Sequence, residues 1–514
     1  MLAADEGIIR IDAARPVNLF IQSSVPAIHA KAAQPGAPGM TGAGVAVGIV
    51  DLGFDFRHPD LRDAAGASRI AFLWDQNLDP VGYENWPSGF SEGVEYTKAQ
   101  IDAQLQQQTP RVPIRHAAQA GAHGTLVAGI AAGTGVGRGA LGRVGVAPES
   151  TLILVSLGKP SATEADSHWG YILDAITYIY RKADALGLPC VINLSMGSND
   201  GAHDGETAVE RAIDQLLLEP GRALVAAAGN EADKRTHAVG VGALGATAVL
   251  RWMIGGPAGA CVCDVPAQME IWFSPADAYE ITLKSPMGEN VQPVSRGRNL
   301  TGVLSDGTKF SVEYEPFCPE NGLSRIFLRL SPGNLSTLPS GEWRVELKCI
   351  QASVGRLDAW IERAPNSVDP SVYRQSEFHQ GDCSRYCTVT TPATAKRAIA
   401  VGAFDHSTGN LAPFSAWGPT RDERRKPDVL APGVSIAAAN ATSAPDRHVT
   451  GDGTSMAAPH ITGIVAQMLQ ASPHLTSGQI AEILAGSATR SAQGYQPDTG
   501  WGVANGRAAL SLLY

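Results

Sequence analysis

Residues 453–460 read Gly-Thr-Ser-Met-Ala-Ala-Pro-His, and the small, apolar residues of 461–469 follow them directly. This pattern predicts a buried helix that begins close to Ser455. A serine hydroxyl is a poor nucleophile at neutral pH, so it needs a base beside it and a third group that orients the base. If Ser455 is a nucleophile, the chain must supply a histidine and a carboxylate elsewhere.

A carboxylate and a histidine each stand at the edge of another apolar motif. Asp51 ends the run 44–50, Gly-Val-Ala-Val-Gly-Ile-Val, which predicts a fully buried strand of a parallel sheet. At that strand end Asp51 could accept the Nδ1 proton of an imidazole and stabilise the imidazolium. His123 leads the run 123–130, His-Gly-Thr-Leu-Val-Ala-Gly-Ile, whose small residues favour a closely packed helix. Each residue alone has an ordinary structural interpretation, such as a cap, but the set indicates nucleophilic catalysis.

The three motifs, in the order Asp51, His123, Ser455, resemble those of the subtilisin-like serine endopeptidases, the S8 subtilase family. The resemblance covers roughly residues 20–240 and 385–514. It implies an α/β fold in three layers, with a mostly parallel sheet and helices on both faces. It also implies an endopeptidase in which Ser455 attacks, His123 moves the proton and Asp51 orients the histidine.

Further segments resemble the parts of a subtilase that bind substrate. Residues 226–230, Ala-Ala-Ala-Gly-Asn, resemble the segment with the oxyanion asparagine, so Asn230 and the backbone N–H of Ser455 are the expected oxyanion donors. Residues 191–197 resemble the substrate-binding strand, whose edge Ser195-Met196-Gly197 would pair with an extended peptide. Glu231 is expected at the rim of the pocket for the residue before the cut.

Composition limits the classes of partner. The chain has 514 residues, 44% hydrophobic and 18% charged, which suits a large protein with more than one domain. Its formal net charge of −10 argues against nucleic acid, because a phosphate backbone requires a basic surface. No apolar stretch reaches the roughly 18 residues that a membrane-spanning helix needs. We therefore expect protein or peptide substrates, and the sequence predicts no oligomeric state.

The N-terminal residues leave the processing of the chain open. Residues 1–16 are acidic and mixed, without the apolar region of a signal peptide. Many subtilases carry a secretion signal and a folded prosegment, whereas here only residues 1–43 precede the first predicted core strand. Either the chain begins near a maturation site or it carries a short leader. An extracytoplasmic location is favoured over a cytoplasmic one.

A block of short alternating runs interrupts the protease pattern. Trp343, Val345, Leu347 and Cys349 alternate with charged residues, as in a half-buried antiparallel strand. We therefore divide the chain into an N-terminal extension (1–20), a first protease part (21–240), an all-β, jelly-roll-like insert (241–363) and a second protease part (364–514). The position of the insert soon after Asn230-Glu231, together with its segments 340–343, Ser-Gly-Glu-Trp, and 357–361, Leu-Asp-Ala-Trp-Ile, resembles the jelly-roll insert of the Csp-type clostridial germination subtilases. We expect it to frame the cleft and to restrict which proteins reach Ser455.

Six of the seven cysteines lie in or just after the insert: Cys261, Cys263, Cys318, Cys349, Cys383 and Cys387. They could form three disulfides, which would favour an oxidising compartment, or several could be reduced core thiols. Zinc is disfavoured, because no pair has the usual Cys-x2-Cys spacing. Calcium is common in the family, and Asp60 is the candidate ligand, but residues 133–144 lack the oxygen-bearing side chains that calcium prefers. No cofactor is expected to be required.

Two functions of other classes compete with hydrolysis. A catalytically silent protein could keep the fold and use the insert for binding or scaffolding. A peptide ligase or transpeptidase could use the same triad, with an amine in place of water as the acceptor. Outside the motifs, His237 is interpreted as a solvated loop residue, with a position lining the cleft as the alternative.

Overall fold

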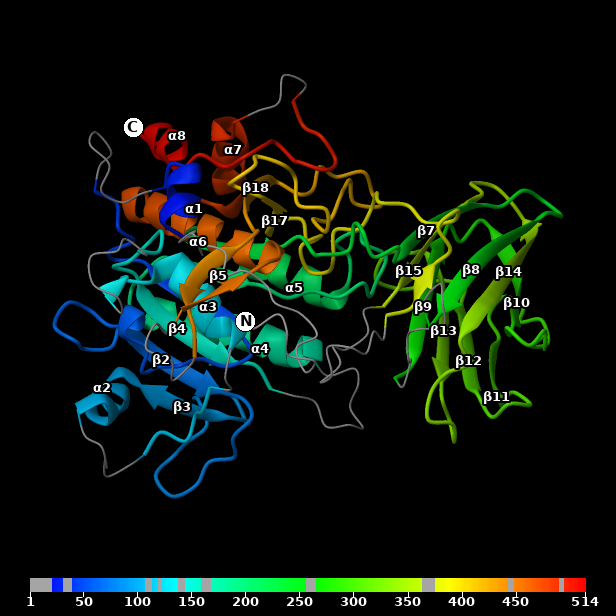
Figure 1. Ribbon diagram of the computed structural model, residues 1–514, viewed down its shortest axis with the longest axis horizontal. Helices are drawn as coiled ribbons and strands as arrows, with labels where there is room; N and C mark the ends of the chain where they lie inside the picture. Colours follow the sequence, from blue (N-terminus) through cyan, green and yellow to red (C-terminus); the bar gives the residue numbers. More distant parts are fainter. Residues whose placement is uncertain are drawn as a thin grey trace, which may run out of the picture.

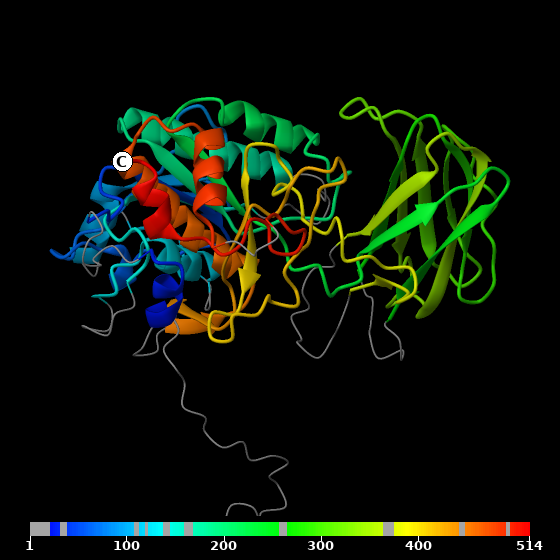
Figure 2. The same ribbon diagram turned by 90° about the horizontal axis from the view of Figure 1, so that it is seen from above.

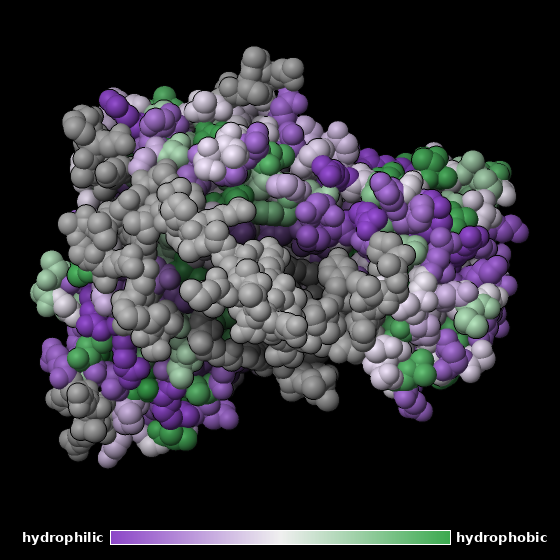
Figure 3. All heavy atoms as spheres, viewed as in Figure 1, coloured by the Kyte–Doolittle hydropathy of each residue, from purple (hydrophilic) through white to green (hydrophobic). Residues whose placement is uncertain are grey.

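The computed structural model describes residues 21–30, 39–106, 113–118, 122–136, 144–158, 168–255, 265–362, 375–441, 448–489 and 494–514. They form two bodies that lie side by side (Figures 1 and 2): a mixed α/β body and a β-sandwich built from the middle of the sequence. The space-filling view shows hydrophilic residues along the visible junction of the two bodies (Figure 3). Among the described helices, none has the length and apolar character required to cross a membrane.

The α/β body is built on one sheet of eight strands. All neighbouring strands are parallel except the edge strand β3, which runs antiparallel to β2. In spatial order the strands are β18 (Val429–Pro432), β17 (Ile399–Phe404), β6 (Arg222–Ala227), β5 (Cys190–Leu194), β1 (Ala46–Asp51), β4 (Thr151–Ser156), β2 (Ile70–Asp75) and β3 (Val94–Thr97). The predicted, mostly parallel sheet is confirmed.

Helices cover both faces of this sheet. Helices α3 (His123–Ala132) and α6 (Thr454–Ala471) pack on one face, and α4 (His168–Ala185) and α5 (Ala208–Leu216) on the other. Strand β1 is apolar up to its last residue, Asp51, because Val47 and Ile49 enter the first core and Val50 enters the second. The three predicted layers are therefore present.

The remaining elements of the α/β body are short. They are α1 (Ile21–Ala27), the 3-10 helix η2 (Pro59–Leu61), α2 (Lys98–Gln106), α7 (Ser477–Ser487), α8 (Gly506–Ser511) and the two-stranded sheet of β19 (Ile436–Ala439) and β20 (His448–Gly451).

The second body is an antiparallel sandwich of a four-stranded and a six-stranded sheet. The first holds β10 (Ala278–Lys284), β14 (Gly341–Gln351), β8 (Thr247–Ile254) and β16 (Glu377–Phe378). The second holds β11 (Asn299–Val303), β12 (Lys309–Glu315), β13 (Ser324–Ser331), β9 (Ala267–Phe273), β15 (Arg356–Ile361) and β7 (His237–Val241). The alternation along β14 is confirmed, since Trp343, Val345, Leu347 and Cys349 all lie in the sandwich core.

The sandwich extends beyond the expected range 241–363 on both sides. Strand β7 begins at His237 and pairs with β15, and β16, after the expected end, pairs with β8. Neither strand shows a distinctive pattern, because β16 has two residues and β7 has five. Their membership of the sandwich depends on long-range pairing.

The cysteines within the described residues are free thiols. Cys190, Cys318, Cys349 and Cys387 are buried and Cys383 is partly exposed. Burial raises the pKa of the Cys387 thiol to about 12. Of the six cysteines in or after the insert, the interpretation as reduced thiols therefore holds for Cys318, Cys349, Cys383 and Cys387. Cys261 and Cys263, which the interpretations with three disulfides or zinc require, lie outside the described residues.

Candidate active site

The end of β1 and the start of α3 bring Asp51 and His123 together. Both oxygens of the Asp51 carboxylate lie 2.9 Å from His123 Nδ1. Asp51 is 1% exposed, whereas the imidazole is 36% exposed. An Nδ1 proton donated to the buried carboxylate fixes the tautomer, so that Nε2 is the basic nitrogen of the ring.

A glycine allows this close approach of helix and strand. A Cβ atom on Gly124 would lie 2.6 Å from the Gly53 carbonyl oxygen and 2.9 Å from Asp51 Cβ. Any larger residue would push α3 away from the turn that follows Asp51. The small residue after His123 is therefore a requirement of the Asp51–His123 contact.

A second buried pair supports the same turn. His116 Nδ1 lies 2.6 Å from Asp75 Oδ2, and His116 Nε2 lies 2.9 Å from the carbonyl oxygen of Phe54 and 3.2 Å from its N–H nitrogen. Burial alone would raise the pKa of Asp75, but hydrogen bonds from His116 and Asn77 and the charge of His116 lower it below its usual value. Sequence reasoning missed this pair, because no local motif connects residues 75 and 116.

Ser455 is the second residue of α6, so the predicted helix start is confirmed. Its Oγ donates to the Ser195 carbonyl oxygen at 3.1 Å, and Ser195 Oγ donates to the Ser455 carbonyl oxygen at 2.9 Å. These reciprocal bonds attach the helix start to the predicted substrate-binding segment. Helix α6 also packs against α3, the helix that begins with His123.

Asn230 lies next to the same helix start. Its Oδ1 accepts hydrogen bonds from the Thr454 N–H at 2.9 Å and from Thr454 Oγ1 at 3.0 Å. Because Oδ1 is used in this way, the amide NH2 group is the part of the side chain left to donate to a bound group. This orientation suits the role of oxyanion donor that the sequence predicts.

A cavity lies beside Ser455, and the predicted substrate-binding residues all line it. Its lining consists of Ser195, Met196, Gly197, Ala227, Gly229, Asn230, Glu231, Thr390, Thr454 and Ser455. Glu231 is 4% exposed, so it is a buried part of the wall, deeper than the rim where the sequence placed it. Thr390 was missed, because its segment carries no catalytic motif.

Asp60, the calcium candidate, has a histidine partner. Its Oδ2 lies 3.0 Å from His448 Nε2, and both side chains are 2% exposed. The pair takes one of the carboxylate oxygens that a calcium ion would use. In the part of the chain that the structure describes, no group of three or more His, Cys, Asp or Glu residues is placed to hold a metal ion. Asp60 is paired with His448 in this structure.

Comparison with known proteins gives consistent matches. The profile of the subtilase family matches residues 42–258 and 383–502. The minor extracellular protease Vpr of Bacillus subtilis is 25% identical over 455 residues, which are 86% of this chain and 48% of Vpr. The serine protease AprX of B. subtilis is 34% identical over 224 residues, 35% of this chain and 50% of AprX. The chain thus spans about half the length of these curated relatives.

A solved structure matches the whole architecture. The CspB protease of Clostridium perfringens superposes with a TM-score of 0.79 at 26% identity, covering 96% of each chain. This match includes the sandwich, which the family profile largely leaves out between its two matched ranges. The predicted resemblance to the Csp-type proteins is confirmed.

Gly124→Ala tests the close packing at the site. The added Cβ meets backbone atoms, so we expect the free energy of unfolding to fall by about 1–3 kcal/mol, as for other overpacked positions. The control is Gly478→Ala in α7, where a Cβ would meet nothing within 4 Å; it should be neutral or stabilising by up to about 1 kcal/mol. Denaturant unfolding followed by circular dichroism measures both. Equal stability of Gly124→Ala and the parent would contradict the argument.

Proposed function

The chain belongs to the subtilase family, and we propose that it is a serine endopeptidase whose catalytic triad is Asp51, His123 and Ser455. The observation that carries this proposal is the buried Asp51 carboxylate, with both oxygens 2.9 Å from His123 Nδ1. The similarity to CspB over the whole architecture supports it.

Each residue of the triad has one chemical task. Ser455 Oγ attacks the carbonyl carbon of the scissile peptide while His123 Nε2 takes its proton. The carbonyl becomes a tetrahedral oxyanion, and its collapse breaks the C–N bond as His123 gives the proton to the leaving amine. Water, activated by His123, then attacks the acyl-enzyme and releases Ser455. Asp51 stays ionised and stabilises the imidazolium in both halves of the reaction.

Donors at the start of α6 would stabilise the oxyanion. The Asn230 NH2 group and the backbone N–H of Ser455 are the two donors, and such preorganised groups often contribute the largest catalytic effect. Because Thr454 holds Asn230 Oδ1, the amide need not reorganise as negative charge develops. An extended peptide would pair with the Ser195–Gly197 edge, with one side chain in the cavity beside Ser455.

Ser455→Ala should abolish peptide hydrolysis, because the acyl-enzyme cannot form. The fold should remain, since the substitution removes a single hydrogen bond, worth about 0.5–1.5 kcal/mol. Turnover of chromogenic peptides and labelling with a fluorophosphonate measure the effect, with the exposed helix serine variant Ser511→Ala as control. Turnover equal to that of the parent would refute the assignment.

The same measurements distinguish the two rival functions. A parent that forms no adduct at Ser455 would favour a silent binding protein. Transfer of the acyl group to an amine, seen in the mass of the product, would indicate a transpeptidase.

Asn230→Ala should lower kcat by about 10² to 10³ with little change in KM, because one oxyanion donor is lost. Asn230→Asp separates this role from a structural one. An aspartate keeps an oxygen to accept from Thr454 but supplies no NH2 donor, so kcat should fall at least as far. Full activity of Asn230→Asp would mean that Asn230 only holds the start of the helix in place. A change confined to KM in Asn230→Ala would mean that Asn230 binds the substrate in its ground state.

Glu231 should favour a basic residue over an acidic one in the cavity. A lysine or arginine side chain would face an opposite charge in a buried wall, and a glutamate would face a like charge. In peptides that differ only at this position, Glu231→Gln should reduce the ratio of kcat/KM for lysine over glutamate by at least about tenfold, or 1.4 kcal/mol. A parent that cleaves after glutamate as well as after lysine would exclude this preference.

A further inference from the structure

The loop that follows the cavity wall is buried between the two bodies. Asn199 lies two residues after Gly197, which lines the cavity, and its side chain donates to the Ile361 carbonyl oxygen of the sandwich at 2.9 Å. Further along the loop, the Gly201 N–H donates to Glu270 of the sandwich at 2.9 Å. The whole stretch 201–205 is buried. The substrate-binding segment therefore continues directly into an interface with the sandwich.

One side chain of this loop connects two walls of the cavity, the segment that carries Ser195–Gly197 and the segment that carries Thr390. His203 Nδ1 lies 2.6 Å from the carbonyl oxygen of Val389, and His203 Nε2 lies 3.0 Å from that of Asn199. Val389 directly precedes Thr390, the lining residue on the opposite segment. A neutral imidazole donates one of these hydrogen bonds at a time, and an imidazolium donates both. In either state the ring spans the backbones of the two lining segments.

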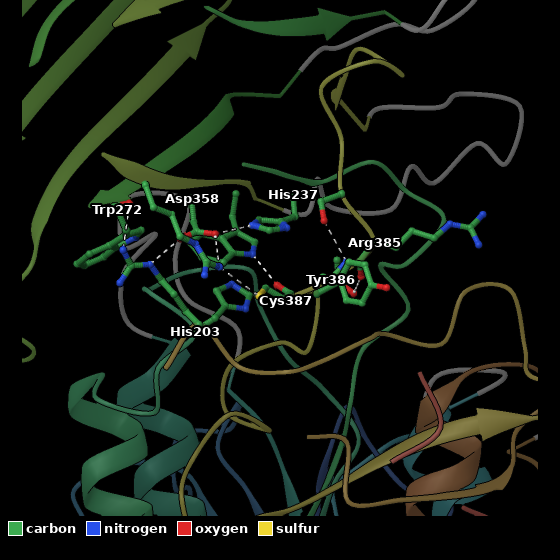
Figure 4. A network of polar contacts seen from close by, with 12 residues as sticks. His203, His237, Trp272, Asp358, Arg385, Tyr386 and Cys387 are labelled. Atoms are coloured by element: carbon green, nitrogen blue, oxygen red, sulfur yellow. Dashed lines mark hydrogen bonds and ion pairs between the residues drawn. The ribbon is translucent and has the colours of Figure 1, made fainter. Parts of the chain in front are cut away.

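The sandwich holds this ring in place (Figure 4). The indole of Trp360, on β15, stacks on His203 with centroids 4.3 Å apart and an interplanar angle of 6°. It stacks on His237 of β7 at 4.7 Å and 24°. Trp360 is 1% exposed and His203 is 0% exposed. His237, interpreted from the sequence as a solvated loop residue, is fully buried, because β7 belongs to the sandwich.

A buried carboxylate completes the network. Asp358 accepts from Arg421 of the α/β body at 3.0 Å, and its other oxygen lies 3.3 Å from His237 Nε2. Burial would raise the pKa of Asp358, but His237, Arg421 and Arg356 hold it at about 2. The backbone N–H of Arg421 donates to the His203 carbonyl oxygen at 3.0 Å. The ion pair between the two bodies therefore also fixes the backbone of His203.

We propose that His203 is a positioning residue through which the docked sandwich sets the separation of the two cavity walls. The inference rests on the proposed function, since it assigns the regulation of that same site to the insert. Two backbone hydrogen bonds link the walls directly: Ser198 N–H to Thr391 O at 2.9 Å, and Thr391 N–H to Ser198 O at 3.0 Å. Thr391 Oγ1 also donates to the Asp200 carbonyl oxygen at 2.9 Å. The backbone amides of Ser198 and Thr391 report whether the walls stay together.

The test uses His203→Phe in the full chain, with His237→Phe as the matched control. Both variants keep a ring against Trp360. His203→Phe loses the contacts to Val389 and Asn199, whereas His237→Phe loses the contact with Asp358, which keeps Arg421 and Arg356 as partners. Hydrogen exchange of the Ser198 and Thr391 amides should accelerate by about tenfold in His203→Phe, as expected for losing about one hydrogen bond, and should not change in His237→Phe. Unchanged exchange at both amides in a folded His203→Phe would overturn the proposal.

Kinetics give a second readout. In His203→Phe, KM should rise by about tenfold for peptides with a large side chain in the cavity and much less for peptides with alanine there, with kcat changing less than KM. His203→Gln, which keeps an N–H donor, should recover part of the affinity, and it replaces His203→Phe if that variant does not fold. If the parent is inactive, the proposed function is refuted. The hydrogen-exchange experiment needs no catalytic activity, so it still tests the role of His203. An active parent with equal KM ratios in both phenylalanine variants would refute the inference alone.

Discussion

The structure depends on the pairing of a buried carboxylate, Asp51, with the His123 ring. A carboxylate that is 1% exposed requires a hydrogen-bonding partner, because its desolvation is costly. This requirement fixes where α3 begins relative to β1, and Gly124 makes that position sterically accessible. Strand β1 lies between β4 and β5 in the sheet, so Asp51 sits centrally at its carboxyl edge.

Other residues of the candidate site lie at the same carboxyl edge of the sheet. Ser195 directly follows β5, and Asn230 follows β6 after two residues. Helix α6 starts where both can reach it: Ser195 exchanges hydrogen bonds with Ser455, and Asn230 receives two from Thr454. The proposed nucleophile, the proposed oxyanion donor and the proposed substrate-binding edge are therefore positioned by one set of hydrogen bonds at the start of α6. A displacement of Ser195, Asn230 or the start of α6 would therefore change the positions of the other two.

Local sequence patterns correctly predicted the residues whose burial and secondary structure depend on their neighbours in the sequence. The apolar run before Asp51, the small residues after His123 and Ser455, and the alternation along β14 each occur where the sequence placed them. The residues that were missed depend on distant partners. His116 is defined by Asp75, and His203 by Val389 and Trp360. The boundaries of the sandwich were narrower than observed for the same reason, since β7 and β16 are strands only through pairing.

The contacts of the sandwich argue for a role beyond framing the cleft. A domain that only restricts access would meet its neighbour through few, exposed and interchangeable contacts. Here the junction contains a fully buried carboxylate, Asp358, paired with Arg421 of the other body, and a stacked pair of His203 and Trp360. Loss of one partner of a buried charge pair is strongly destabilising, because it leaves a desolvated charge. The sandwich is therefore docked through buried and specific contacts, and the loop beneath it leads to the cavity wall at Gly197 within a few residues.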